Sequence, residues 1–216
     1  MPRRKLICSA AMGFSADTLR DRVAIVTGAS QGIGRAIAIE LARVGAHVIA
    51  CSRRRAAVEA VAESVRAEGR RALAIGCDVG EARQVDEVVA RTVDEFGRID
   101  LLVNNAGYRI RSPLEDLPRE EWDAMVRINL TGVFLFSQAV GRVMIRQRSG
   151  KIVNVSSVAG RTGARGMAAY AAAKAGVTVL TRSLGAEWAK HASPSTPWLP
   201  VPRRRKVCWR SGRLLP

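Results

Sequence analysis

The chain has 216 residues, a length that suits one domain with a sizeable core. A hydrophobic content of 48% is that of a soluble globular protein, and no apolar run reaches the roughly 18 residues that a membrane span needs, so no membrane partner is expected. The net charge of +16 would suit a nucleic-acid-binding protein, but the basic residues collect at the two chain ends and are otherwise scattered over predicted helical faces, so we expect no specific nucleic-acid partner.

The first segment of the chain carries no strand or helix pattern, and we predict a disordered lead over residues 1–20. Its basic start is that of a secretory signal, but Ser9 interrupts the apolar stretch of about 7 to 15 residues that a signal needs. Met12 is an alternative start of translation.

The cysteines lack the C-x-x-C spacing of a metal or redox motif, and they are Cys8, Cys51, Cys77 and Cys208. Cys51 and Cys77 stand at the ends of apolar runs, where we predict buried thiols of a reducing compartment. The expected location is therefore cytoplasmic, and no metal site is predicted.

From Arg22 onward, short β-branched runs alternate with Ala-rich amphipathic stretches. Strands are predicted over residues 22–27, 47–52, 71–79 and 151–157, and a further strand with its exit loop over residues 99–107. Helices are predicted over residues 34–45, 55–69, 82–97, about 119–147 and 168–191. Strict alternation favours a parallel sheet covered on both faces. We therefore predict one doubly wound α/β domain over residues 21–191, with its site outside the carboxyl ends of the strands.

The first strand runs into the glycine-rich stretch "TGASQGIG", Thr27 to Gly34, and then into a helix. In that position Gly28 permits a tight turn, Gly32 lets the backbone approach a pyrophosphate, and Gly34 lets the helix pack on the strand. The helix N-terminus offers free N–H groups to a phosphate. No G-K-[ST] ending follows, which disfavours a nucleotide-triphosphate loop. A tight turn without a ligand is the alternative.

The residue after the second strand distinguishes the two nicotinamide dinucleotides. A carboxylate there would hold the ribose 2′-hydroxyl of NAD, whereas this chain has Ser52 followed by Arg53, Arg54 and Arg55. An arginine can pair with a 2′-phosphate, so NADP(H) is favoured over NAD(H). The alternative is that the basic run is only the exposed first turn of a helix.

Four polar residues stand where catalysis would need them. Asn129 interrupts the apolar stretch "MVRINLTGVFLF", and Ser157 follows the fifth predicted strand. Tyr170 and Lys174 are four residues apart on one predicted helical face. A lysine one turn away stabilises the phenolate form of a tyrosine, which makes it a usable proton donor and acceptor.

Together with "TGASQGIG", "NNAG" (Asn104 to Gly107) and "NVSSVAG", these residues resemble the short-chain dehydrogenase/reductase family. The likeness covers Asp21 to His191, with the motifs in the family's order and spacing. It implies a single Rossmann domain with strands in the order 3-2-1-4-5-6-7, usually assembled as a homodimer or homotetramer. It also implies a small-molecule carbonyl or alcohol substrate.

The resemblance implies a role for each motif residue. Tyr170 is the general acid and base on the substrate oxygen, and Lys174 binds the nicotinamide ribose and assists the tyrosine. Ser157, preferred over Ser156 by its spacing to Tyr170, hydrogen-bonds the substrate oxygen, and Asn129 holds a water in a proton relay. The implied cofactor-binding residues are Thr27, Gly28, Ser30, Gly32, Ile33, Gly34, Ser52, Arg53, Asp78, Val79, Asn105, Ala106, Gly107, Tyr170 and Lys174.

These motifs do not identify the substrate. Family members of this kind act as 3-oxoacyl-thioester reductases or as sugar and polyol dehydrogenases, and both alternatives stay open.

The family pattern ends at His191. A segment like H-G-I-x-V-N-x-V-x-P-G should follow and form the sixth strand, but here "ASPSTPWLPV" follows. Four prolines within residues 194–202 cannot form a central strand, because proline lacks the N–H donor. We therefore predict a domain without the family's sixth and seventh strands, and a disordered Pro/Arg-rich tail over residues 192–216.

A one-base deletion near codon 191, in the gene or in its sequencing, would account for this break. With suitable codons, one added base turns residues 192–200 into Gly-Ile-Pro-Val-Asn-Ala-Val-Ala-Pro, which follows the family segment. The chain is an oxidoreductase by ancestry in this interpretation. The alternative is a truncated, catalytically inactive dinucleotide-binding protein, and the DNA sequence through codon 191 tests the hypothesis.

Overall fold

The structure is a computed structural model, and it describes residue 15 and residues 17–189. The predicted tail, most of the predicted lead, Cys8 and Cys208 lie outside the described residues. Just before the first strand, residues 17–21 form a turn. Its backbone N–H groups at Leu19 and Asp21 donate to the carbonyls of Val44 and Gly45 at 2.7 and 3.1 Å. These two bonds attach the turn to the segment at Val44 and Gly45.

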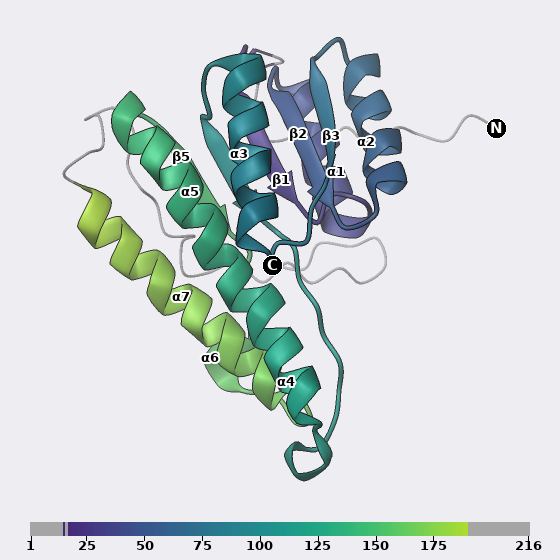
Figure 1. Cartoon of the computed structure of the whole chain (residues 1–216), viewed down its shortest axis with the longest axis vertical. Coiled ribbons are helices and arrows are strands. Elements are labelled where there is room, and N and C mark those ends of the chain that lie inside the picture. Colours follow the sequence, from purple (N-terminus) through teal and green to yellow (C-terminus); the bar gives the residue numbers. More distant parts are fainter. Residues whose placement is uncertain (1–14, 16, 190–216) are drawn as a thin grey trace, which may run out of the picture.

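A five-stranded parallel sheet forms the centre of the domain (Figure 1). Its strands are β1 (Val23–Thr27), β2 (His47–Ser52), β3 (Ala72–Gly76), β4 (Leu101–Asn104) and β5 (Lys151–Asn154). Their order in the sheet is β3-β2-β1-β4-β5, as the resemblance predicts for the first five strands. Within the described residues, β5 pairs with β4 alone and forms an edge of the sheet.

Helices cover both faces of this sheet (Figure 1). They are α1 (Gly32–Arg43), α2 (Arg55–Ala67), α3 (Ala82–Phe96), α4 (Arg119–Val126), α5 (Gly132–Gln147), α6 (Ala159–Thr162) and α7 (Ala168–Trp188). Successive strand residues point to opposite faces. Ile25 therefore packs with side chains of α3 and α5, whereas Val26 packs with side chains of α1 and α2. The predicted doubly wound architecture is confirmed.

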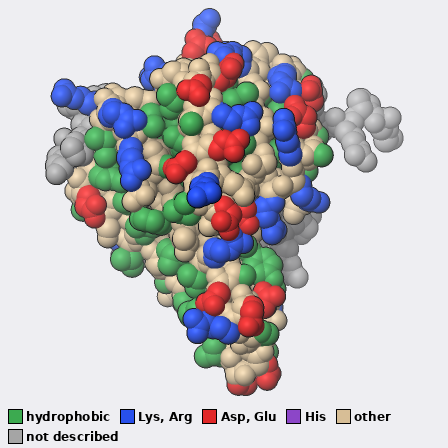
Figure 2. All heavy atoms as spheres, viewed as in Figure 1, with side chains coloured by type: hydrophobic (Ala, Val, Ile, Leu, Met, Phe, Trp, Pro, Cys, Tyr) green, Lys and Arg blue, Asp and Glu red, His purple; other side chains and the backbone are tan. Residues whose placement is uncertain are grey.

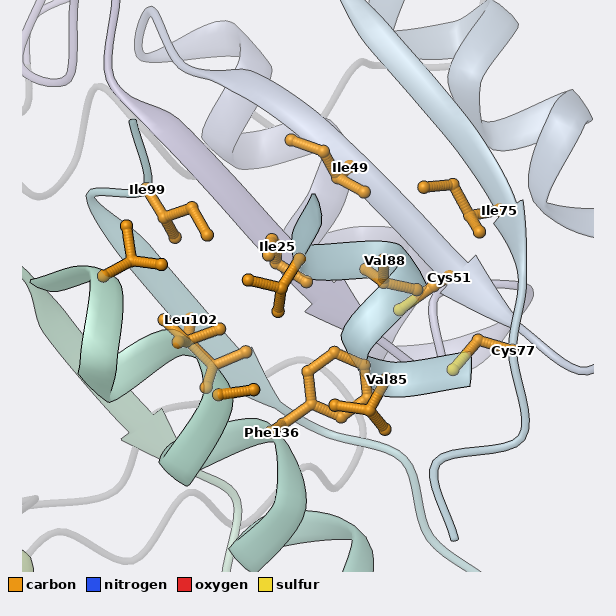
Figure 3. Packing of buried hydrophobic residues seen from close by; sticks show 14 of the residues in the cluster. Ile25, Ile49, Cys51, Ile75, Cys77, Val85, Val88, Ile99, Leu102 and Phe136 are labelled. Atoms are coloured by element: carbon orange, nitrogen blue, oxygen red, sulfur yellow. The ribbon is translucent and has the colours of Figure 1, made fainter. Parts of the chain in front are cut away.

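The core between the sheet and the helices α3 and α5 is the larger of the two (Figure 3). Phe136 of α5 is fully buried there beside Leu102 and Ile25. Cys51 and Cys77 lie in the same cluster as free thiols, which confirms the prediction that they are buried. Burial raises the pKa of both thiols, that of Cys77 to about 12, so both are inert at neutral pH.

The predicted long helix over residues 119–147 is continuous, but it changes pitch in its middle. Between α4 and α5, residues Arg127–Thr131 (η3) form a π-helical turn. The whole stretch is long and apolar enough to cross a membrane by length and composition, yet half of its most apolar part is buried within the described protein. It is a core helix of this fold.

The visible surface shows basic and acidic side chains interspersed over the helices (Figure 2). Several of them form ion pairs between residues of the same helix, such as Arg66 with Glu63 at 2.7 Å in α2 and Arg119 with Asp123 at 3.0 Å in α4. This mixture agrees with the interpretation of the scattered basic residues as solvated helical surface.

Candidate functional site

The glycine turn is fastened to the loop that follows β4. The hydroxyl of Thr27 accepts hydrogen bonds from the backbone N–H groups of Asn105 and Ala106, each at 3.0 Å. The side-chain amide of Asn105 in turn donates to the carbonyls of Thr27 and Gly28 at 3.0 and 3.3 Å. Two predicted cofactor segments, far apart in sequence, are thereby brought together at the carboxyl ends of β1 and β4.

Close packing explains two of the three glycines. A Cβ on Gly34 would lie 2.4 Å from both the Asn105 amide nitrogen and the Gly28 carbonyl oxygen, and one on Gly28 would lie 2.7 Å from Cα of Ala106. Gly32 is different, because it has φ +55° and faces open space. The exposed Gly32 begins α1, whose first turn has no acidic residue, so its N–H groups are available to an anion.

The turn's sensitivity to packing gives a first prediction. Gly34→Ala should lower the free energy of unfolding by about 1–3 kcal/mol, because the added methyl overlaps a backbone carbonyl that cannot move away. Gly185→Ala is the matched control, since that helical glycine has no neighbour within 4 Å of a Cβ. Urea unfolding of both variants would measure the difference, and equal stability of the two would contradict it.

The basic run after β2 lies beside the glycine turn. The guanidinium of Arg54 donates to the side-chain carbonyl of Gln31 at 3.3 Å, and Ser52 donates to the backbone carbonyl of Arg54 at 3.4 Å. Arg53 is exposed and makes no ion pair with the described residues. Its charge is close enough to help lower the pKa of Asp78, the carboxylate that follows β3.

The structure places Asn129 in the π-helical turn, fully buried. Its amide group donates to the carbonyls of Tyr108 and Met125 at 2.7 and 2.9 Å and accepts from the N–H of Tyr108 at 3.2 Å. Asn129 therefore fixes the β4 exit loop to the long helix. Because π-helical turns are frequent at functional sites, this irregularity is a further reason to propose Asn129 as a site residue.

The two serines after β5 have different environments. Ser156 contacts α7, since its hydroxyl donates to the carbonyl of Lys174 at 3.2 Å and shares a hydrogen bond with the Thr178 hydroxyl at 2.9 Å. The half-buried Ser157 accepts only a bond of 3.2 Å from the N–H of Ala159 among the described residues. Ser157 thus keeps a hydroxyl proton for a further partner, which supports its choice over Ser156.

Tyr170 and Lys174 lie one turn apart near the start of α7. The Lys174 ammonium nitrogen is 5.9 Å from the centre of the Tyr170 ring and donates to the carbonyl of Val155 at 2.8 Å. Only 3% of Lys174 is exposed, and within the described residues no carboxylate forms an ion pair with it. Burial lowers the pKa of Lys174 from 10.5 to about 8.

The predicted residues therefore lie at the carboxyl ends of the strands and on the loops and helices that follow them. Leu130, next to Asn129, packs against α7, where a Cβ on Gly176 would lie 3.0 Å from it. This contact places the π-helical turn beside the helix that carries Tyr170 and Lys174. Sequence reasoning missed the structural role of Ser156 and that of Arg127, which binds Asp78. Neither has a local signal, because their partners are distant in sequence.

Comparison with protein families gives a match over most of the chain. The model of the family described as short chain dehydrogenase matches residues 22–192.

Among curated proteins, a 3-oxoacyl-[acyl-carrier-protein] reductase of Synechocystis sp. is 44% identical over 172 residues, which cover 79% of this chain and 70% of that protein. The 2,3-dihydro-2,3-dihydroxybenzoate dehydrogenase of Bacillus subtilis is 42% identical over 178 residues, covering 82% of this chain and 68% of the relative.

Solved structures with a similar fold are also dehydrogenases of this kind by their names. An NAD⁺-bound xylitol dehydrogenase superposes with a TM-score of 0.79 at 38% identity, covering 81% of this chain and 67% of that one. A short-chain type dehydrogenase/reductase from Mycobacterium marinum superposes with a TM-score of 0.77 at 36% identity, covering 80% and 69% of the two chains.

Proposed function

This chain belongs to the short-chain dehydrogenase/reductase family of oxidoreductases, and we propose that it interconverts a carbonyl and a secondary alcohol with NADP(H). The observation that carries the proposal is the Tyr170–Lys174 pair. The Lys174 ammonium is buried next to a tyrosine ring, and among the described residues it has the Val155 carbonyl but no carboxylate as a partner, an environment typical of functional sites.

The residues at the carboxyl ends of the strands suit a nicotinamide dinucleotide, the cofactor class of this family. Open space at Gly32 and the uncapped start of α1 suit a pyrophosphate, and the exposed Arg53 suits a 2′-phosphate. Asp78 supplies an ionised acceptor for the adenine amino group. The cofactor, when bound, supplies or accepts the hydride.

The protein's own contribution is to orient the substrate and to move a proton. Ser157 would donate a hydrogen bond to the substrate oxygen, and Tyr170 would give that oxygen its proton during reduction. The Lys174 ammonium, 5.9 Å from the centre of the Tyr170 ring, would act together with the tyrosine in this proton transfer. Both amide hydrogens of Asn129 are donated to the carbonyls of Tyr108 and Met125, so a water of the proton relay could bond its side chain only by donating to Oδ1.

A direct assay tests the proposal. Purified chain would be mixed with NADPH and a panel of ketones that includes a 3-oxoacyl thioester and keto sugars, and NADPH oxidation would be followed by absorbance. Turnover supports the oxidoreductase, and the preferred ketone decides between the two substrate classes. NADPH binding without turnover supports a dinucleotide-binding protein without catalysis, and absence of both contradicts both functions.

The matched region covers 70% and 68% of the two curated relatives, so the segment that follows it in them bears on the second function. A DNA sequence that restores the family's next segment after codon 191 would support the single-base deletion and would supply the chain on which to repeat the assay.

Cofactor choice gives a second prediction. Arg53→Glu should change the ratio of the NADPH and NADH dissociation constants by about 10- to 100-fold in favour of NADH, because a carboxylate repels the 2′-phosphate. Arg146→Glu is the control, since it makes the same charge change at the exposed end of α5. Fluorescence titration measures both ratios. An unchanged ratio in Arg53→Glu would show that the basic run is only an exposed helix start.

We further propose that the chain is cytoplasmic and assembles as a homodimer or homotetramer, without a specific nucleic-acid or membrane partner. Two large apolar side chains on the outer surfaces of the long helices support assembly. Phe134 of α5 is 43% exposed and Val179 of α7 is 59% exposed. The buried free thiols Cys51 and Cys77 support a reducing compartment.

A further inference from the structure

Arg127, the first residue of the π-helical turn, reaches across to the loop that follows β3. One guanidinium nitrogen donates to Asp78 Oδ2 at 3.0 Å, and the other donates to Glu81 Oε1 at 3.1 Å. The second oxygen of Asp78 accepts from the backbone N–H of Gly80 at 2.9 Å. Both oxygens of the Asp78 carboxylate are therefore held, one by a side chain from another element and one by its own loop.

The loop backbone also rests against the Arg127 side chain. A Cβ on Gly80 would lie 2.4 Å from Arg127 Nη1 and 2.8 Å from its Cγ, so only glycine permits this approach without displacing the arginine. At the other end of the turn, a Cβ on Gly132 would lie 2.7 Å from Val79 Cγ2. The β3 exit loop thus contacts both ends of the π-helical turn.

The same turn holds the exit loop of β4 through Asn129. The Asn129 side chain bonds both the N–H and the carbonyl of Tyr108, and a Cβ on Gly107 would lie 3.1 Å from Asn129 Oδ1. One π-helical turn therefore holds the exit loops of β3 and β4, two strands that β2 and β1 separate in the sheet. These loops contain Asp78 and Val79 on one side and Asn105–Gly107 on the other.

The electrostatics of this contact indicate a role beyond stability. The Arg127 side chain is 37% exposed and the Asp78 side chain 21% exposed, so this ion pair is partly solvated. Such pairs contribute little to folding free energy. A planar guanidinium that bridges two carboxylates does, however, fix their orientation, which a lysine ammonium does less well.

We propose that Arg127 is a positioning residue for the adenine half of the dinucleotide. It holds the Asp78 carboxylate and the Gly80 backbone where the adenine ring and its amino group would be received. The proposal rests on the dinucleotide function proposed above, and it adds a residue to which the sequence analysis assigns no role. Arg127 acts through Asp78 and need not touch the ligand.

Binding measurements on the full chain test this role. Arg127→Met removes the charge, Arg127→Lys retains it without the fork, and Gly80→Ala displaces the arginine through the added methyl. Arg119→Met is the matched control, because Arg119 pairs with Asp123 at 3.0 Å on the same helical stretch, away from the loop. The probes are NADPH and adenosine 2′,5′-bisphosphate, which contains only the adenine half of the dinucleotide. Calorimetry would give the dissociation constant of each probe, and circular dichroism would check that each variant is folded.

Arg127→Met should raise both dissociation constants about tenfold and by the same factor, because the lost contact serves the adenine half alone. Arg127→Lys should recover part of the loss, Gly80→Ala should reproduce it, and Arg119→Met should leave both constants unchanged.

Unchanged binding of both probes by Arg127→Met, or a loss with NADPH alone, would overturn the positioning role and leave the proposed function standing. Failure of the unaltered chain to bind either probe would refute both. If Arg127→Met does not fold, the Arg127→Lys and Gly80→Ala variants decide by the same criterion.

Discussion

Replacing Tyr170 with Phe should lower kcat for carbonyl reduction by about 10²- to 10⁴-fold, the usual contribution of a positioned general acid. The ring and its contact with the Lys174 ammonium remain in the variant, so the site keeps its shape and loses only the proton donor. The change should therefore fall on kcat, while the dissociation constant for NADPH changes far less. Steady-state kinetics with the best ketone of the panel, together with an NADPH titration, would measure both.

The chain's other tyrosine provides the matched control. The hydroxyl of Tyr108 donates to Glu121 at 2.8 Å, outside the Tyr170–Lys174 pair. Tyr108→Phe should keep most of the activity because the backbone contacts of Tyr108 with Asn129 do not involve its hydroxyl. If both variants retained full activity, another group would have to be the proton donor and the assignment of Tyr170 would be wrong.

The order of strands and helices was predictable because each βα unit carries its own periodic pattern. The stretch from β1 to α1 shows this, since an apolar run, a glycine turn and an amphipathic helix follow one another within 21 residues (Val23–Arg43). The order of the first five strands in the sheet came from the family resemblance, and the structure agrees with it.

The π-helical turn was not predictable from periodicity. The predicted helix over residues 119–147 has one apolar pattern throughout, and nothing local marks the extra residue at Arg127–Thr131. The turn is stabilised by tertiary contacts instead, because Asn129 satisfies the backbone of Tyr108, 21 residues earlier in the chain. Such contacts have no sequence period, which is also why the role of Arg127 was missed.

A buried polar chain behind the site was missed for the same reason. Asn104 at the end of β4 donates to Asn154 at the end of β5 at 2.9 Å, and Asn154 donates to the Thr181 hydroxyl on α7 at 2.9 Å. The partners are separated by 50 and 27 residues. This series of hydrogen bonds links the carboxyl ends of both strands to α7, which bears Tyr170 and Lys174, so the geometry of the candidate site depends on long-range contacts.

The second prediction with a large expected effect concerns Lys174, because burying its charged ammonium group lowers the free energy of unfolding. A lysine with a pKa of about 8 in the folded chain and 10.5 when exposed is destabilising at pH 7, because folding must bury its charge. The difference, 10.5 − 8 = 2.5 pKa units, corresponds to about 3 kcal/mol. Loss of the hydrogen bond to the Val155 carbonyl would cancel about 1–2 kcal/mol of the gain from neutralising this group.

Lys174→Met should therefore raise the free energy of unfolding at pH 7 by about 1–2 kcal/mol, while it reduces catalysis strongly. Below pH 8 the lysine is charged in both states and the cost is complete. Between pH 8 and 10.5 the unfolded chain binds more protons, so the stability of the unaltered chain rises with pH. The stability advantage of the variant should shrink over that window, and urea unfolding at pH 7, 9 and about 10.5 would measure this decrease.

Lys151→Met, at the half-buried start of β5, is the control, and its free energy of unfolding should not rise in this way. A variant less stable than the unaltered chain at pH 7, or an advantage independent of pH, would show that the Lys174 ammonium is not buried at a cost.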